Sequence, residues 1–362
     1  WLQKIFVGEV SMDVIAPKED EAVPAYMRNN ALFRPFQAVT EMFGFPSMKD
    51  IDPTPWLTPF FFVFFGLCLS DVGYGLILVS LATFFLLFGK LPGLVKDALR
   101  LLLFSGGAAV LGGVFLGGYF GMTPEQAPSF LLAAEGSVLP FKGQFIDTMS
   151  KEGPMQLLIL TVVLGIIQLL FGIVLDFFRR WGQGDRSGAL MDSLPWFLFV
   201  SSLVAFGAWE SLGLPQELCQ KAALYAMILL IVTQSRTQKN WLLKPIVGAL
   251  SLFNVTGYIS DALSYSRVMA LGLATGVIGF AMNMTAGILS GMMPSPFLGV
   301  LVATVVILFG HTLNFCLSLL GAFVHSGRLQ FIEFFGKFFD GGGKKFKPFT
   351  RETGYLFFSS RS

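Results

Sequence analysis

The chain has 362 residues, of which 54% are hydrophobic and 13% carry a charge. A soluble domain carries roughly 25% charged residues, so this composition excludes an ordinary soluble protein and predicts an all-α membrane protein. The formal net charge of +2 is too small to suggest a partner made of nucleic acid. The cysteines Cys68, Cys219 and Cys316 lack C-x-x-C spacing, so we expect neither a disulfide set nor a metal site.

Residues 1–56 are mixed and polar, and we expect them to form a cytoplasmic connector that leads to the membrane. The first residue is Trp rather than Met, so we expect the natural chain to begin further upstream. The segment DIDPTPW, residues 50–56, ends this region, and its two prolines stiffen the approach to the first apolar run.

Long apolar runs fill most of the remaining sequence, and a membrane span needs roughly 17–25 such residues. These runs are 57–88, 99–121, 154–178, 194–212, 216–234, 246–290 and 296–334, and residues 336–362 follow as a polar tail. Lysine and arginine concentrate in 89–100, 179–190, 235–244 and the tail after 328. The intervening loops are poor in positive charge, so the positive-inside rule places these basic segments, and with them the tail, in the cytoplasm.

Because the loop 89–100 is assigned to the cytoplasm, the run 57–88 must cross the membrane an even number of times if the N-terminal segment is cytoplasmic too. The sequence SDVGYG, Ser70–Gly75, offers an aspartate and two glycines for a turn. We therefore favour a short hairpin, which gives about eight spans with the last two long and tilted. A single long tilted helix with the N-terminus outside is the alternative. In 99–121, glycines at 113, 117 and 121 predict a face that packs against a neighbouring helix.

The last long run carries polar residues at helical spacing. Steps of three and four residues keep them on one helical face. They are His311, Asn314, Ser318, Gly321, His325 and Arg328. Polar groups inside a span are costly, and a stripe about 25 Å long at 1.5 Å per residue suits an ion pathway. Hydrogen bonding between packed helices is the alternative interpretation.

Arg267 interrupts an otherwise apolar stretch, SYSRVMALGLATG, and small residues such as Ser264 share its helical face. Asn254, Tyr258 and Asp261 lie on its N-terminal, cytoplasmic side. Because a guanidinium group stays charged in proteins, we predict that Arg267 favours the ionised form of a mobile carboxylic acid that approaches it. The alternative is a salt bridge to another span. The candidate acids for that bridge are Asp71, Asp176, Asp192 and Glu210.

Three motifs in order resemble subunit a of the rotary V-type/A-type ATPases, in its bacterial or archaeal form. The first is RPFQAVTEMFG with DIDPTPWLTPFF and FFGLCLSDVGYG, the second is ALSYSRVMALGLATG, and the third is GAFVHSGRLQFIEFFGKFFDGGGKKFKPF. The resemblance covers about residues 25–350. It implies a membrane stator beside a ring of c subunits, with two half-channels that couple H⁺ or Na⁺ flow to ATP turnover.

The same resemblance implies roles for individual residues. Arg267 corresponds to the essential arginine and Arg328 to a supporting one. The resemblance places Asn254, Tyr258 and Asp261 on the cytoplasmic ion path and Asp71 on the outer one. From the helical spacing we add Ser264 and the stripe residues His311, Asn314, Ser318 and His325 to the predicted ion pathway.

The family also has stalk subunits as partners, which bind through an N-terminal domain missing from this sequence. We expect an integral protein of a prokaryotic plasma membrane, with no cofactor and no ATP site in this chain, since no Walker A pattern is present. A secondary transporter with its own midplane ion site is the alternative function.

Overall fold

The computed structural model describes residues 23–47, 50–89, 91–133, 139–235, 248 and 250–346. Within this part of the chain, six helices are long and apolar enough to cross a membrane, and two shorter apolar helices precede them. These match the predicted number of spans and confirm the all-α membrane fold, including the length of the last two helices.

The elements follow one another with short connections. The first described residues form β1 (Pro24–Ala25), η1 (Arg34–Phe36) and α2 (Gln37–Phe43). The apolar helices are α3 (Thr54–Leu69), α4 (Val72–Phe88), α5 (Gly93–Leu116), α6 (Gly153–Gly182), α8 (Leu194–Gly207), α9 (Gln216–Gln234), α11 (Asn254–Ser264), α12 (Ser266–Gly291) and α13 (Pro296–Arg328). Between α6 and α8 lie α7 (Arg186–Gly188) and the π-helical turn η2 (Ala189–Ser193), and α13 continues through η5 (Leu329–Phe335), α14 (Gly336–Phe338) and β2 (Lys344–Lys345).

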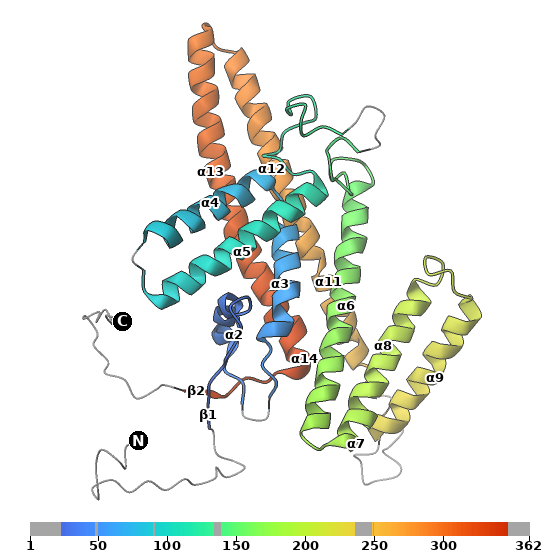
Figure 1. Cartoon of the computed structure of the whole chain (residues 1–362). Helices are drawn as coiled ribbons and strands as arrows, with labels where there is room; N and C mark the ends of the chain where they lie inside the picture. Colours follow the sequence, from blue (N-terminus) through green and yellow to red (C-terminus); the bar gives the residue numbers. More distant parts are fainter. Residues whose placement is uncertain are drawn as a thin grey trace, which may run out of the picture.

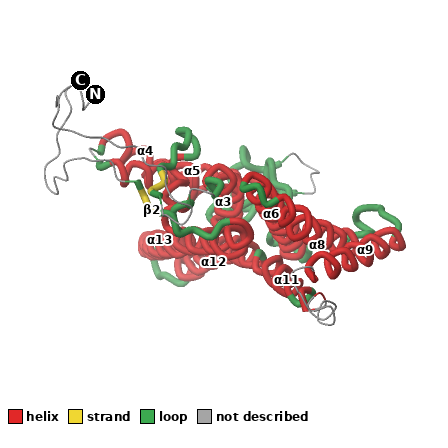
Figure 2. The backbone as a smooth tube through the Cα atoms, turned by 90° about the horizontal axis from the view of Figure 1, so that it is seen from below, coloured by secondary structure: helices red, strands yellow, loops and turns green. Residues whose placement is uncertain are grey.

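Helix α3 occupies the centre of the bundle, where it packs against α5, α12 and α13 (Figure 1). Its aromatic residues Phe61, Phe64 and Phe65 are fully buried. A helix that is apolar on all sides is stable only when neighbours surround it, and this position provides those neighbours. Helices α8 and α9 form a separate pair at the far end of the elongated cross-section (Figure 2).

The predicted break inside 57–88 lies at Ser70 and Asp71, and two short helices follow from it as expected. Ser70 adopts a left-handed conformation with φ 37°, which ends α3. Beyond the turn, α4 runs beside α5 rather than back along α3 (Figure 1). The two helices of the predicted hairpin therefore share α5 as their packing partner.

Glycines on α5 permit this arrangement, because a side chain there would collide with backbone. A Cβ at Gly113 would lie 2.4 Å from the amide nitrogen of Val72, and one at Gly112 would lie 2.3 Å from the carbonyl oxygen of Gly66. The predicted packing face is confirmed at Gly113 but not at Gly117. Helix α5 ends at Leu116, and Gly117 with φ 73° forms its left-handed C-cap.

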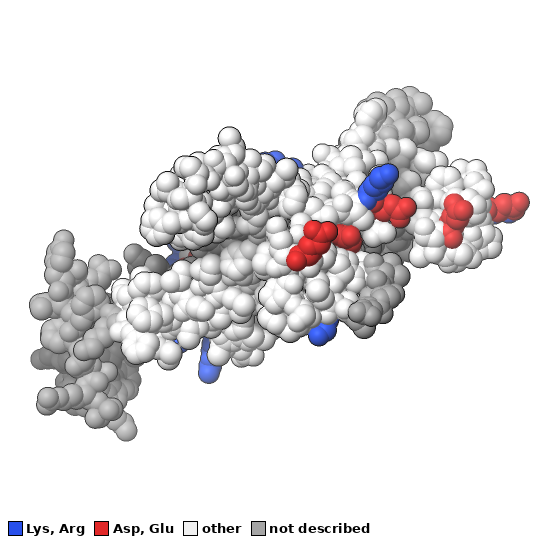
Figure 3. Space-filling model, turned by 90° about the horizontal axis from the view of Figure 1, so that it is seen from above, with Lys and Arg blue, Asp and Glu red and all other residues white. Residues whose placement is uncertain are grey.

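The two ends of the described chain meet at one end of the bundle. Strands β1 and β2 pair in parallel there, close to α14 and on the same side as α7 (Figure 1). The opposite end carries the connection between α5 and α6 and the turn between α12 and α13 (Figure 1). Seen from that opposite end, the surface is mostly uncharged and its acidic side chains gather toward one side (Figure 3). Most of the basic segment 235–244 and the tail beyond 346 lie outside the described residues.

Candidate functional site

Arg267 lies in the first turn of α12, just after Tyr265 separates this helix from α11. Its side chain is 30% exposed, and one guanidinium nitrogen lies 3.7 Å from Oε1 of Glu333. The other terminal nitrogen donates to the hydroxyl of Ser264 at 3.1 Å. None of the four acids predicted as salt-bridge partners forms this ion pair. Within the described residues the partner is Glu333, which is contributed by η5.

Two hydrogen bonds through Gln168 link η5 to the start of α12. The side-chain amide of Gln168 on α6 donates to Oε1 of Gln330 at 2.6 Å. The hydroxyl of the fully buried Tyr265 donates to the other end of the Gln168 side chain at 2.8 Å. Because these contacts join α6, η5 and the start of α12, they fix the backbone on both sides of the Arg267–Glu333 pair.

Arg328, the last residue of α13, is exposed. Among the residues that the structure describes, none forms an ion pair or a hydrogen bond with its side chain. His325, one turn earlier, has a buried Nδ1 for which the described part of the chain offers no hydrogen-bond partner. The predicted supporting role of Arg328 and the pathway role of His325 stay predictions.

The other stripe residues point into the protein, where they join α13 to α4 and α12. Nδ1 of His311 lies 2.8 Å from the hydroxyl of Tyr74, and Nε2 lies 3.0 Å from Oδ1 of Asn283. Asn314, which is buried, donates to the Tyr74 hydroxyl and to the carbonyl oxygen of Thr275.

Ser318 continues this network one turn further along α13. It accepts a hydrogen bond from the Thr275 hydroxyl at 3.1 Å and donates to Oδ1 of Asn314 at 3.2 Å. His311, Asn314 and Ser318 thus form a continuous chain of hydrogen bonds between packed helices, as the alternative interpretation of the sequence expected. A chain of this kind is compatible with ion transfer, so the pathway role of these residues stays a prediction.

A cavity of about 640 Å³ lies beside the outer end of this network. Its walls are mostly apolar side chains from α4, α13 and the loop after α5, and His311, Asn283 and Tyr74 supply polar groups. The hydrogen-bond network therefore runs from this cavity to residues that are buried deeper inside the bundle.

Asp71 is buried at the start of α4 and accepts two backbone N–H groups. The N–H of Tyr74 donates at 2.9 Å and the N–H of Phe120 at 2.7 Å. The first contact caps α4, and the second anchors the loop after α5. This structural use accounts for the aspartate at the turn, while its predicted place on an ion path stays a prediction.

A second cavity, of about 440 Å³, lies near the end of the bundle that carries α14. Asn254 and Tyr258 line it, as the predicted cytoplasmic route required, together with Trp196 from α8. Asp261 is not among the lining residues, but its carboxylate pairs with Nζ of Lys337, which does line the cavity, at 2.5 Å. The Lys337 ammonium also lies 4.1 Å from the ring centroid of Tyr258, so one lysine contacts both Asp261 and Tyr258.

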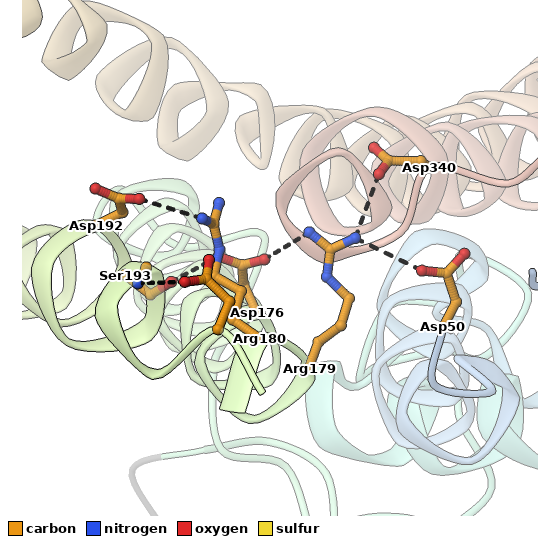
Figure 4. A network of polar contacts seen from close by, with 9 residues as sticks. Asp50, Asp176, Arg179, Arg180, Asp192, Ser193 and Asp340 are labelled. Atoms are coloured by element: carbon orange, nitrogen blue, oxygen red, sulfur yellow. Dashed lines mark hydrogen bonds and ion pairs between the residues drawn. The ribbon is translucent and has the colours of Figure 1, made fainter. Parts of the chain in front are cut away.

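Charged residues of α6 and η2, namely Asp176, Arg180 and Asp192, also line this second cavity. Both oxygens of the buried Asp176 are used: one accepts from Arg179, and the other accepts from Arg180 and from the Ser193 hydroxyl. Arg179 reaches further to Asp50 and Asp340, while Arg180 reaches Asp192 (Figure 4). The network ties the segment before α3 and the segment after α14 to the end of α6.

The sequence profile of the V-type ATPase 116kDa subunit family matches residues 8–106 and 253–351, which include the helices that carry Arg267, Glu333 and the stripe. The chain belongs to this family. A-type ATP synthase subunit I of Methanocaldococcus jannaschii is 30% identical over 96% of this chain and 52% of its own length. The corresponding subunit I of Pyrococcus abyssi is 31% identical over 96% of this chain and 51% of its own length.

Bacterial relatives are also similar. V-type ATP synthase subunit I of Chlamydia muridarum is 28% identical over 94% of this chain and 58% of its own length. This chain spans about half the length of the curated relatives it matches. The family expected from the three motifs is confirmed.

Among the described residues of this family member, no group of three or more His, Cys, Asp or Glu side chains is arranged to hold a metal ion. The residue that sequence reasoning missed is Glu333. It lies inside the third motif, but five residues after Arg328 an α-helix would have turned roughly 140° from the stripe. A local sequence signal for its contact with Arg267 is therefore lacking.

Proposed function

We propose that this chain is the membrane stator of a rotary ATPase, in which Arg267 faces a carboxylate on a ring of small membrane subunits. Ions, H⁺ or Na⁺, would reach that carboxylate through two half-channels and couple ring rotation to ATP synthesis or hydrolysis. The relatives named as A-type and V-type ATP synthase subunits support this assignment. Contacts with stalk subunits, and a plasma membrane location with both ends of the chain cytoplasmic, belong to the same proposal.

The observation that carries the proposal is the state of the Arg267 side chain. It is partly exposed inside an apolar span, one of its nitrogens lacks a hydrogen bond within the described residues, and its ion pair measures 3.7 Å. Placing a charged side chain inside a membrane span costs free energy, so such a residue is first assigned a functional role. An arginine serves this purpose better than a lysine, because a lysine can lose its proton in such surroundings.

The surface around Arg267 leaves space for a partner. Along the same face of α12, the exposed residues Ala270, Ala274 and Ala281 follow Arg267 toward the outer end. Small side chains permit the close approach of another helix in lipid. We propose that this face meets the ring, with Arg328 on α13 as a second permanent charge nearby in the pair of helices.

The two cavities supply the ends of the proposed ion paths. The cavity lined by Asn254 and Tyr258 opens toward the α14 end, and Lys337 and Asp261 lie between it and the Arg267–Glu333 pair. The cavity lined by His311 lies on the other side of Arg267, and the Asn314–Ser318 network leads inward from it. A stator that passes ions across the membrane needs two such routes, one from each end of the bundle, that approach the same arginine.

The test is Arg267→Lys in the complete subunit, assembled with its partner subunits and reconstituted in vesicles. We expect ATP-driven ion uptake to fall to background while the complex assembles normally, because the lysine can no longer hold a fixed charge. Arg100→Lys is the matched control, since Arg100 forms only an exposed ion pair with Asp97. Full uptake by the Arg267→Lys complex would exclude the proposed role and favour a transporter with its own ion site.

A further inference from the structure

Glu333 reaches Arg267 because the helix changes its type just before it. Helix α13 ends at Arg328, and η5 (Leu329–Phe335) continues with π-helical bonding. In an α-helix, five residues rotate by roughly 500°, which would turn Glu333 about 140° away from Arg328. The i→i+5 bonds of a π-helix change this rotation, and in η5 Glu333 lies buried beside Arg267 while Arg328 stays exposed. Such segments occur frequently at functional sites.

The carboxylate of Glu333 lies in surroundings that do not favour a charge. Its side chain is 2% exposed, and its neighbours Phe334, Phe335 and Phe338 are almost completely buried. Within the described residues, Oε2 has no hydrogen-bond partner, and Arg267 is the cation within ion-pair distance of Oε1. Burying an acid this deeply is costly unless a charge compensates it, so its position beside Arg267 needs an explanation.

The pair is looser than the structural ion pairs of the same molecule. Arg179 and Arg180 each donate a hydrogen bond of 2.8 Å to Asp176. Arg267 and Glu333 are 3.7 Å apart, without a hydrogen bond between them. A separation of this size attracts the guanidinium toward the carboxylate but leaves its donors available for another acceptor.

We propose that Glu333 is a positioning residue, the resident counter-ion that holds Arg267 between successive contacts with the carboxylate of the ring. This inference rests on the function proposed above. When a ring carboxylate arrives, it replaces Glu333 as the ion-pair partner of the Arg267 guanidinium. When that carboxylate leaves, Arg267 pairs with Glu333 again. Asp261 does not compete with Glu333 for Arg267, because Asp261 forms an ion pair with Lys337 of α14.

The experiment replaces Glu333 in the complete subunit of the assembled ATPase. With Glu333→Gln, we expect ATP hydrolysis and ATP-driven ion uptake per assembled complex to fall roughly tenfold, with an unchanged number of ions per ATP. The reason is that the ring carboxylate then becomes the only counter-ion of Arg267 and leaves it slowly. Glu333→Asp keeps the charge and should restore most of the rate. Glu217→Gln, at an 85% exposed side chain, is the matched control.

The outcomes separate this inference from the proposed function. If Glu333→Gln complexes work at the wild-type rate while Arg267→Lys abolishes uptake, the counter-ion role is wrong and the stator assignment stands. If Arg267→Lys itself leaves uptake intact, the proposed function fails. Where Glu333→Gln prevents assembly, the double variant Arg267→Gln with Glu333→Gln decides: restored assembly supports the pair, and no restoration overturns it.

Discussion

The hydroxyl of Tyr74 lies 2.8 Å from Nδ1 of His311, which joins two helices that are 237 residues apart in sequence. Because this hydroxyl accepts a hydrogen bond from Asn314, its own proton is available to the imidazole. The neutral tautomer with its proton on Nε2 then fits Oδ1 of Asn283 at 3.0 Å. One tyrosine thus sets the orientation and the protonation pattern of the outer polar network.

We expect Tyr74→Phe to destabilise the subunit by about 1–3 kcal/mol, because His311 and Asn314 both lose a buried partner. The measurement is the midpoint of thermal unfolding of the purified complex in detergent. Tyr225→Phe, at an exposed tyrosine of α9, is the control. Equal midpoints for both variants would show that the Tyr74 contacts contribute nothing to stability.

Ser318→Leu is expected to slow ion flux several-fold without dissociating the ring, because it interrupts the chain from Asn314 to Thr275. Ser318→Ala, which removes the hydroxyl without added bulk, should act in the same direction. Thr304→Leu on the same helix is the control, since the exposed Thr304 bonds only to its own helix at Val300. Flux is measured in vesicles under an imposed ion gradient, and unchanged flux would leave the network as a packing contact alone.

Gly113→Ala should lower the amount of assembled, folded subunit strongly, because the new Cβ would meet the backbone of Val72 at 2.4 Å. Gly107→Ala lies on the same helix and has nothing within 4 Å of the added atom. We expect this control to be neutral or to stabilise α5 by about 0.5–1 kcal/mol, since alanine restricts the unfolded chain more than glycine does. Similar yields of the two variants in membranes would contradict the close contact of α4 and α5.

Asp176→Asn should cost on the order of 3 kcal/mol of stability, because it leaves Arg179 and Arg180 near the end of α6 without their shared carboxylate. The thermal midpoint and limited proteolysis of residues around Asp50 and Asp340 would report the loosened end of the bundle. Asp97→Asn removes two ion pairs with the exposed arginines Arg34 and Arg100 and should change little. A stable Asp176→Asn complex would mean that Asp50, Asp192 and Asp340 suffice to hold the two arginines.

Much of the helical framework is predictable from the sequence, because crossing a lipid bilayer requires long apolar runs whose backbone bonds are satisfied internally. The break at Ser70 and Asp71 was also readable, since an aspartate beside glycines is typical of a turn that begins a helix. The spacing of His311, Asn314 and Ser318 correctly placed them on one face. These features depend on residues that are close in sequence.

The contacts of that face depend on the tertiary structure. The spacing along α13 cannot say whether His311 and Asn314 turn toward the ring or toward Tyr74, because helices in lipid are placed by packing and not by the burial of apolar surface. The partner of Arg267 was likewise beyond the sequence, since three of the four acids proposed for it are used elsewhere: Asp71 caps a helix, Asp176 lies between two arginines, and Asp192 pairs with Arg180. By itself the sequence determined that a fixed positive charge stands in the membrane. Only the tertiary structure, in which the π-helical segment η5 packs beside α12, decided that Glu333 lies next to this charge.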